Sequence, residues 1–377
     1  MSEKVRVIVF GGCGFIGRHI VAELIEADVA SYIKVVDKVP PEMAWLNVGH
    51  KKLFTDPKIK FKSANLIRKE SCEAAFEEEE FDWAINAAGE TKTGQVEAVY
   101  KEGILGLSSN IAKMVAGRGV SLFLEISSGQ LESSEKKPVP EVTECHPWSV
   151  IGRYKFEAEK VIKSIPGLNW IIVRPGIVYG PGDKLGLTPR MLVGAICRYL
   201  GTEMKLLWDH NLKMNTIHVK DLARTVSHLC QRRRTCEIYN AVDESESTQD
   251  TISKIISNIF NVEYEFCGTT MSKLAMSEGS NTVQYVNEKH LEPWLKMCTA
   301  SNIHNTPLTP YIDLESLHHK HLNLDGSKLR SEGFEFHYPK PTFQTFIEVL
   351  DDFISMNLLP KDIYSNEKKN VDAESSQ

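Results

Sequence analysis

Apolar residues in the first 175 positions form short continuous runs, separated by segments in which apolar groups recur at helical spacing. Six runs have the length and β-branched character of strands that are covered on both faces, and they lie at 5–10, 33–37, 59–61, 83–89, 121–128 and 169–174. Three of the intervening segments predict amphipathic helices at 15–25, 96–115 and 148–162. Strands that alternate with helices predict an α/β fold with a doubly wound parallel sheet and right-handed crossovers.

Beyond residue 175 this alternation loosens. The pattern predicts a glycine-rich loop at 176–186, a helix near 190–200, and short strands at 205–208, 216–219 and 237–241 that return to the sheet. Residues 262–320 are polar and irregular, which we interpret as a small variable lobe over a substrate cleft. The charged segment from Lys361 onward is expected to be disordered.

Glycines follow the first strand directly, at Gly11, Gly14 and Gly17. Glycine at these positions lets the chain turn tightly, approach a pyrophosphate and pack against the strand, and the amides that open the next helix then face the anion. The second strand ends at Asp37, about 20 residues after the last glycine, as in dinucleotide-binding folds. A glycine-rich turn beside an ordinary strand-ending aspartate is the structural alternative.

The acid at position 37 bears on which dinucleotide would bind. A carboxylate there accepts hydrogen bonds from an adenosine ribose and repels a 2′-phosphate, so the sequence favours NAD and makes NADP less likely as the cofactor. Lys38 and Arg18 are close in sequence and could soften that preference. We therefore predict a Rossmann-like NAD-binding core at 1–175, completed by strands within 205–245. A mainly substrate-binding lobe with returning elements would occupy 176–360, and the disordered tail 361–377.

Polar and small residues at the ends of the later strands are further candidates for cofactor contacts. Asn65 could hydrogen-bond the edge of an adenine, although capping of the next helix explains it equally well. Small residues at 87–89 would let the sheet edge approach the cofactor closely. The full set of candidate cofactor-binding residues is Gly11, Gly14, Phe15, Ile16, Gly17, Asp37, Asn65, Leu66, Ala87, Ala88, Gly89, Lys155 and Pro175.

Composition narrows the class of partner. The net charge of -6 and the isoelectric point near 6.1 argue against nucleic acid as the main partner. The eight cysteines include no CxxC pair, which is typical of reduced thiols in a cytoplasmic protein. No apolar run reaches 18 residues, so we expect neither secretion nor a membrane span. The histidines near 318–321 lack acidic or cysteine partners at ligand spacing, so we predict no metal site.

These motifs together resemble the extended short-chain dehydrogenase/reductases, of the NAD-dependent epimerase/dehydratase type and related to 3β-hydroxysteroid dehydrogenases. The resemblance is carried by residues 11–17, Asp37, 86–89, 126–128, Lys155 with Glu159, 174–182, 217–223, 324–329 and 333–334. It implies hydride transfer between a substrate carbon and the nicotinamide. In this family a Tyr acts as acid/base, a Lys four residues later holds the nicotinamide ribose, and a Ser and an Asn support them.

Two of those four positions are filled here and two are not. Ser128 and Lys155 match the family, whereas Ile151 stands at the tyrosine position and Gly103 at the asparagine position. Isoleucine cannot transfer a proton. Tyr154 is a candidate substitute, although it lies about 4.5 Å further along the helix axis at the α-helical rise.

The resemblance therefore leaves two functions open. The first is an NAD-dependent oxidoreductase, epimerase or dehydratase that acts on a nucleotide sugar or a related alcohol or ketone. Its catalytic residues would be Ser128, Lys155 and Tyr154, with Glu90 or a water held by Lys155 as other sources of the acid/base. The second is a catalytically inactive, NAD-binding regulatory or structural subunit. By analogy with the family, a homodimer could form through the helices at 95–117 and 148–164.

Overall fold

The structure, a computed structural model, describes residues 4–364. The chain separates into two compact units. Unit 1 runs from the N-terminus to Gly182 and also contains 213–246 and 320–340, while unit 2 contains 183–212, 247–319 and the chain from 341 onward. The disordered tail was predicted to begin at residue 361. Residues 365–377 of it lie outside the described residues, whereas residues 361–364 are described. Its first part is ordered, because Ile363 and Tyr364 are buried.

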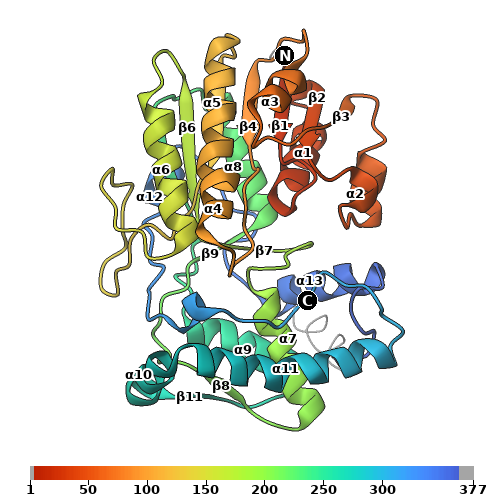
Figure 1. Ribbon diagram of the computed structural model, residues 1–377, viewed down its shortest axis with the longest axis vertical. Helices are drawn as coiled ribbons and strands as arrows, with labels where there is room; N and C mark the ends of the chain where they lie inside the picture. Colours follow the sequence, from red (N-terminus) through yellow and green to blue (C-terminus); the bar gives the residue numbers. More distant parts are fainter. Residues whose placement is uncertain (1–3, 365–377) are drawn as a thin grey trace, which may run out of the picture. The chain divides into compact units, whose positions relative to one another are not determined.

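The centre of unit 1 is a seven-stranded parallel sheet (Figure 1). Its strands are β1 (Val5–Phe10), β2 (Ala30–Asp37), β3 (Ile59–Ser63), β4 (Trp83–Asn86), β5 (Leu122–Ile126), β6 (Trp170–Pro175) and β10 (Glu237–Ala241). They are ordered β10-β6-β5-β4-β1-β2-β3, and every neighbouring pair is parallel. The strand order therefore reverses between β1 and β4, and the predicted doubly wound, Rossmann-like sheet is confirmed.

Helices cover both faces of this sheet. One face carries α1 (Phe15–Glu26) and α8 (Val219–Arg232), and the other carries α3 (Lys69–Phe76), α5 (Leu107–Gly117) and α6 (Val150–Ser164). Alternate residues of β1 enter the two cores: Val7 and Val9 pack on the α1 side, and Ile8 and Phe10 pack on the α5 side. Burial on both faces explains why this strand is a continuous apolar run in the sequence.

Unit 1 also contains shorter elements. These are η1 (Pro41–Met43), α2 (Val48–Leu53), α4 (Glu97–Tyr100), the π-helical segment η2 (Lys101–Gly106), β7 (Ile177–Tyr179), β9 (Thr216–His218) and α12 (Ser327–Ser331). The helix predicted at 96–115 is thus present as α4, η2 and α5 in succession. Of the strands predicted to return to the sheet, only β10 joins it, because β9 pairs with β7 in a separate ribbon.

Unit 2 is mostly helical. Its elements are α7 (Thr188–Leu200), β8 (Met204–Leu206), α9 (Gln249–Phe260), β11 (Tyr264–Phe266), α10 (Gly268–Glu278), α11 (Ser280–Ala300), η3 (Leu314–Leu317) and α13 (Phe343–Ser355). The strand predicted at 205–208 pairs with β11 and not with the large sheet. The expectation that 262–320 is irregular is wrong, since α10 and α11 occupy much of it. Only Asn287, Trp294 and Cys298 of α11 are buried, so its apolar periodicity is weak.

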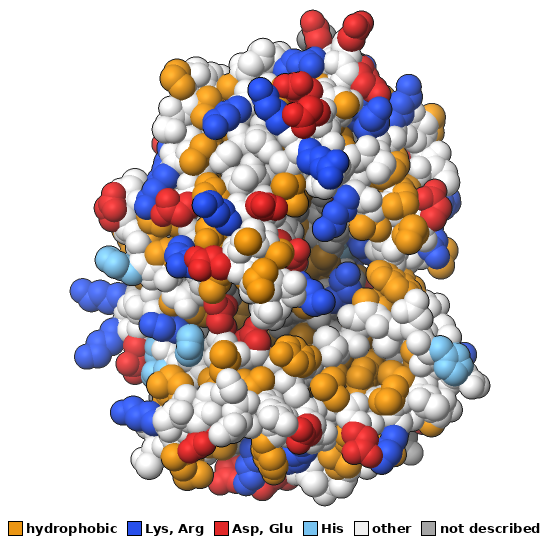
Figure 2. Space-filling model, in the orientation of Figure 1, with side chains coloured by type: hydrophobic (Ala, Val, Ile, Leu, Met, Phe, Trp, Pro, Cys, Tyr) orange, Lys and Arg blue, Asp and Glu red, His pale blue; other side chains and the backbone are white. Residues whose placement is uncertain are grey.

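On the face drawn in Figure 2, basic and acidic side chains are interspersed, consistent with the mild net charge of -6. Within residues 4–364, no helix has both the length and the apolar character required to cross a bilayer.

Candidate functional site

The turn that follows β1 has no room for a side chain at positions 11 and 17. Gly11 has a φ of 73°, and a Cβ on it would lie 2.6 Å from the backbone nitrogen of Ala88. A Cβ on Gly17 would lie 2.1 Å from the carbonyl oxygen of Gly11. The Gly14 amide donates to that same oxygen at 3.0 Å. The turn is therefore closed by backbone contacts, and larger residues at 11 or 17 would open it.

Helix α1 begins immediately after the turn, and its N-terminus has no side-chain cap. Gly14 is the N-cap residue, no side chain accepts a hydrogen bond from this end, and the first turn contains no acidic residue. The partial positive charge of the helix N-terminus is thus left for an anion. Phe15 and Ile16 form this first turn, where Ile16 packs on the core and the ring of Phe15 meets that of His19 edge-on.

Asp37 ends β2 beside the glycine turn. Its Oδ2 accepts a hydrogen bond from the Cys13 amide at 3.1 Å, and its Oδ1 accepts one from the Val39 amide at 3.1 Å. Burial raises the pKa of Asp37, while these backbone hydrogen bonds act in the opposite direction. The carboxylate is therefore held in one orientation at the end of the strand.

Arg18 does not offer its charge to a ligand as the sequence allowed. The side chain is buried, and its guanidinium donates to four backbone carbonyl oxygens, those of Cys13, Gly14, Ala44 and Trp45. The guanidinium braces the glycine turn against the segment around residue 45. The expectation that Arg18 softens the preference against a 2′-phosphate is thus not supported by its contacts.

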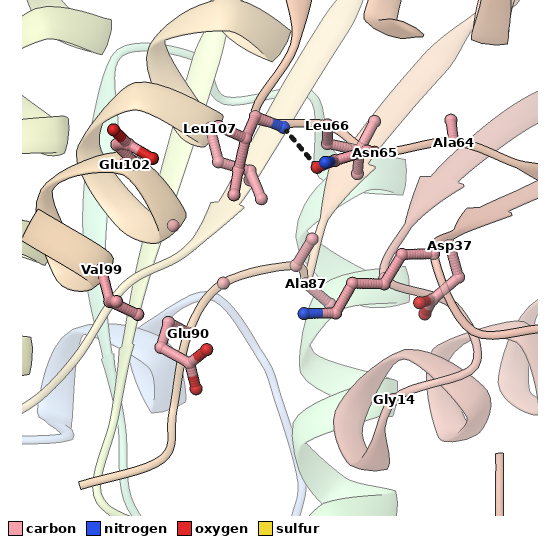
Figure 3. A pocket seen from close by; sticks show the side chains of 16 residues that line it. Gly14, Asp37, Ala64, Asn65, Leu66, Ala87, Glu90, Val99, Glu102 and Leu107 are labelled. Carbon is pink, nitrogen blue, oxygen red and sulfur yellow. Dashed lines mark hydrogen bonds between the residues drawn. The ribbon is translucent and has the colours of Figure 1, made fainter. Parts of the chain in front are cut away.

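A cavity of about 270 Å³ lies at the carboxyl ends of β1 to β4, where the strand order reverses (Figure 3). It is lined by Gly11, Gly14, Asp37, Lys38, Ala64, Asn65, Leu66, Ile67, Ala87, Ala88, Gly89, Glu90, Val99, Glu102, Gly103 and Leu107. Asp37 lies at one end in the view drawn, and Glu90 and Val99 lie at the other. In open α/β sheets, ligands bind at this reversal point.

The cavity brings together eight of the residues proposed from the sequence: Gly11, Gly14, Asp37, Asn65, Leu66, Ala87, Ala88 and Gly89. Asn65 both lines it and accepts a hydrogen bond from the Ile67 amide at 3.3 Å, so its side-chain oxygen also closes a local turn. Phe15, Ile16, Gly17 and Pro175 are not in the lining. Gly17 acts instead through its contact with Gly11, and the Pro175 carbonyl accepts a hydrogen bond from the Gly129 amide.

One wall of the cavity was not predicted from the sequence, which marked Gly103 only as the residue at the family asparagine position; the wall consists of Val99, Glu102, Gly103 and Leu107. These residues lie on and beside η2, where the helix widens into a π-helical turn. The Gly103 carbonyl there accepts a hydrogen bond from the Glu90 amide at 3.1 Å, which ties the helix to the loop after β4. The glycines at 103 and 106 were the available signal, since glycine inside a helix often has a packing or functional reason.

Lys155 lies just behind the cavity wall. Its Nζ would be 3.5 Å from a Cβ placed on Gly89, a lining residue. The ammonium donates to the Ile126 carbonyl oxygen at 2.6 Å and to Oε1 of Glu125 at 3.0 Å. Glu125 was not predicted from the sequence, because it lies inside a largely apolar strand and no motif marks it.

Ser128 and its neighbour Ser127 have different surroundings. Ser128 is half-buried, and its hydroxyl oxygen accepts a hydrogen bond from the Gln130 amide at 3.1 Å. The Ser127 hydroxyl donates to Oε1 of Glu159 at 2.5 Å, and Glu159 in turn is paired with the buried Arg174. Ser127 and Glu159 thus belong to a buried network of side chains with Arg174. Ser128 is not part of that network, and among the described residues its hydroxyl acts only as an acceptor for the Gln130 amide.

The tyrosine that could replace the family acid/base is directed elsewhere. The Tyr154 hydroxyl donates to Oε1 of Glu97 at 2.9 Å, and this hydrogen bond raises the pKa of Tyr154. Ile151 packs against a small apolar cluster formed by Tyr100, Ile104 and Tyr154. Neither side chain lines the cavity. Within residues 4–364, no group of three or more His, Cys, Asp or Glu is arranged to hold a metal ion.

Comparison with known proteins places this site in a family context. The family model described as the NAD dependent epimerase/dehydratase family matches residues 7–241. Bifunctional protein GAL10 of Kluyveromyces lactis is 26% identical over 273 residues, 64% of this chain but only 39% of its own length. A putative UDP-glucose 4-epimerase of Methanocaldococcus jannaschii is 24% identical over 272 residues, 67% of this chain and 81% of its own.

Solved structures show the same fold. The UDP-glucose 4-epimerase of Thermus thermophilus in complex with NAD has a TM-score of 0.65 and 20% identity, with 93% of this chain and 99% of that chain covered. A dTDP-glucose 4,6-dehydratase from Streptomyces venezuelae, with NAD bound, has a TM-score of 0.68 and 17% identity, with 93% and 97% covered. With the glycine turn, Asp37 and the cavity placed as described, the family match leads to one conclusion. The chain belongs to the NAD-dependent epimerase/dehydratase family.

Proposed function

We propose that the chain binds NAD in the cavity at the carboxyl ends of β1 to β4 and uses it in oxidoreductase, epimerase or dehydratase chemistry. The observation that carries this proposal is one arrangement: the side-chain-free turn at Gly11, the uncapped start of α1 and the Asp37 carboxylate all border the same space. A pyrophosphate would fit against the glycine turn and the start of α1, and a ribose with two free hydroxyls would fit beside the Asp37 carboxylate. Since Arg18 is fully engaged by carbonyl oxygens, a 2′-phosphate would meet Asp37 with only Lys38 to offset it.

The substrate that we propose is a nucleotide sugar or a related alcohol or ketone. Relatives named as UDP-glucose 4-epimerase and dTDP-glucose 4,6-dehydratase support this class. NAD, when bound, supplies a hydride acceptor. Lys155, beside Gly89 at the cavity wall, would hold the ribose of the nicotinamide half. Ser128, with its hydroxyl proton available, would donate a hydrogen bond to the substrate oxygen.

For the proton transfer we propose Glu90 in preference to Tyr154. Glu90 lines the cavity and follows Gly89, the residue against which Lys155 packs. Its Oε1 accepts a hydrogen bond from the Lys92 amide at 2.8 Å, which fixes one carboxylate oxygen and leaves the other to act on a substrate. Tyr154 by contrast is already hydrogen-bonded to Glu97 and is absent from the lining.

A second function, an NAD-binding subunit without catalysis, is favoured by one observation. Ile151 stands at the family tyrosine position and belongs to an apolar cluster. Loss of an acid/base group costs about 10²- to 10⁴-fold in rate and does not by itself abolish activity. Family membership gives this alternative no advantage over the enzymatic one, so we retain it as the outcome to be tested.

The experiment is a calorimetric titration with NAD⁺, NADH and NADPH, followed by a substrate screen with UDP- and dTDP-hexoses. We expect NAD⁺ and NADH to bind more tightly than NADPH. Asp37→Ala should weaken NAD⁺ binding. Asp56→Ala is the matched control, because the Asp56 carboxylate also accepts the amide of the residue two positions on, Lys58, but lies outside the cavity. Failure to bind any dinucleotide would reject both functions, and binding without any turnover would favour the subunit.

A further inference from the structure

The buried carboxylate of Glu125, behind the cavity, accepts hydrogen bonds from three side chains. Glu125 lies in β5, its side chain is fully buried, and its direction along the strand places it on the α5 side of the sheet, with Phe123. Oε2 accepts a hydrogen bond from the side-chain Nδ2 of Asn86 at 2.6 Å, and Oε1 accepts one from the Ser108 hydroxyl at 2.9 Å. Three elements, β4, α5 and β5, thus meet at this carboxylate.

The fourth element is α6, which supplies Lys155. Its Nζ lies 3.0 Å from Oε1 of Glu125, and its side chain is only 9% exposed. A buried ion pair of this kind is a poor source of stability, since apolar residues of similar volume are often as good or better. Removal of one member, in contrast, leaves an uncompensated charge in the interior. The pair therefore calls for a reason other than the stability of the fold.

The position of the ammonium suggests that reason. Gly89 lines the cavity and has no side chain, and Lys155 Nζ would lie 3.5 Å from a Cβ at that point. A bound ligand would thus have the ammonium at the wall and the Glu125 carboxylate directly behind it. Seen from the cavity, the two charges largely cancel. Without the carboxylate, a full positive charge would act on the ligand through an environment of low effective dielectric.

We propose that Glu125 is a positioning residue whose carboxylate balances the charge of Lys155 and so sets the relative affinity of the site for oxidised and reduced dinucleotide. This inference rests on the proposed function, in which the nicotinamide half of NAD lies toward Lys155. The oxidised ring carries one positive charge that the reduced ring lacks. An unbalanced ammonium nearby repels the oxidised ring more than the reduced one, so Glu125 keeps NAD⁺ competitive with NADH.

The test compares dissociation constants for NAD⁺ and NADH in the full-length chain. Glu125→Gln keeps the shape and one hydrogen-bond acceptor but removes the charge. We expect it to shift the NAD⁺/NADH affinity ratio toward NADH by about tenfold, the effect of a single charge at several ångströms in a partly screened site. The double variant Glu125→Gln/Lys155→Met removes both charges and should return the ratio to within about twofold of the wild type, although both forms bind more weakly.

Glu159→Gln is the matched control. Glu159 is also fully buried and paired with a cation, Arg174, but neither residue lines the cavity. It should lose stability as Glu125→Gln does and leave the affinity ratio unchanged. Circular dichroism confirms that each variant is folded under the conditions of the titration.

The outcomes separate this inference from the proposed function. A wild type that binds neither form rejects the proposed function. A wild type that binds both, with an unchanged ratio in folded Glu125→Gln, overturns the inference alone. Should Glu125→Gln fail to fold, Glu125→Met gives the second test: it also removes the charge but fills a similar volume with an apolar side chain, so the ratio should again shift toward NADH, and a ratio equal to that of the wild type in the folded variant overturns the inference.

Discussion

A Cβ on Gly103 would lie 3.1 Å from the Cβ of Glu90, so the glycine at the family asparagine position is what allows the Glu90 segment to pack against η2. The Glu90 amide also donates to the Gly103 carbonyl oxygen at 3.1 Å. A larger side chain at 103, such as the asparagine of the family, would collide with Glu90 in its present position. The glycine at 103 and the position of the Glu90 carboxylate therefore depend on each other. Glu90, which the sequence offered only as one of several sources of the acid/base, is thereby held at the cavity wall.

This contact predicts an unequal response of two helical glycines to alanine. Gly117→Ala should stabilise the fold by up to about 0.5 kcal/mol, because Gly117 is the last residue of α5, alanine is the better helix former, and nothing lies within 4 Å of the new methyl group. Gly103→Ala should give no such stabilisation, because its methyl group would crowd the Cβ of Glu90, and it should weaken NAD⁺ binding. Urea unfolding and calorimetry measure the two effects. Equal stabilisation by both substitutions would show that the Glu90 contact carries no strain.

The glycine turn predicts that alanine substitutions at Gly17 and Gly14 differ in their effect on stability. Gly17→Ala should destabilise unit 1 by about 3 kcal/mol or more, because its Cβ would lie 2.1 Å from a backbone oxygen that cannot move alone. Gly14→Ala meets the same oxygen at 3.1 Å and should be much better tolerated. Thermal unfolding followed by circular dichroism gives the comparison. A Gly14→Ala variant as unstable as Gly17→Ala would contradict this account.

Asp37 should control the choice between NADH and NADPH. Asp37→Ala removes both the ribose acceptor and the charge that repels a 2′-phosphate, so the preference for NADH over NADPH should fall at least tenfold, by about 1.4 kcal/mol. Fluorescence titration with both reduced forms measures the ratio. Asp56→Ala should leave the ratio at the wild-type value. An unchanged ratio in Asp37→Ala would mean that the adenosine ribose does not lie at the end of β2.

Ile151 allows a direct test of the missing acid/base. If a nucleotide sugar is turned over with the nicotinamide near Lys155, Ile151→Tyr should raise kcat by at least about tenfold, a fraction of the usual acid/base contribution. Ile151→Phe adds the ring without the hydroxyl and should give no gain. The readout is the interconversion of UDP-glucose and UDP-galactose, measured by chromatographic separation of the two nucleotide sugars, because epimerisation returns the hydride to the sugar and accumulates no NADH. The same result for both variants would show that the hydroxyl is not what limits the reaction.

Buried histidines predict how stability depends on pH. Burial lowers the pKa of His50 to about 4 and that of His218 to about 3, both below the ordinary value of 6.5. Below pH 6.5 the unfolded chain therefore binds protons that the folded chain does not, and the free energy of unfolding falls by up to about 1.4 kcal/mol per pH unit per histidine. Asp243, whose pKa burial raises to about 6, acts in the opposite direction between pH 6 and 4.

The variant that isolates this effect is His50→Gln. Its free energy of unfolding, measured by urea titration between pH 7.5 and 5, should fall less steeply than that of the wild type. His304→Gln, at an exposed position, should retain the wild-type slope. Parallel slopes for His50→Gln and the wild type would show that His50 takes up protons equally well in the folded and unfolded chain.

Much of unit 1 could be predicted from the sequence by itself. Strands buried on both faces are mostly apolar, and the turn has room only for glycine at positions 11 and 17, so both the sheet and the turn after β1 can be recognised in the local sequence. Asp37 is recognisable for the same reason, because its distance from the turn is fixed by one helix and one strand. The helices α10 and α11 were missed because their mostly exposed faces carry little apolar periodicity.

Only the tertiary structure decided what surrounds Lys155, Tyr154 and Glu90. A hydrogen bond between Tyr154 and Glu97, 57 residues apart, or an ion pair between Lys155 and Glu125, 30 residues apart, depends on how helices register on the sheet. The spacing of residues along the sequence does not reveal how a helix is aligned on the sheet, because each side chain has the same neighbours in sequence wherever its helix packs. The sequence thus determined the fold and the cofactor edge, and the packing of α4, η2 and α6 on the sheet determined which charged groups face one another.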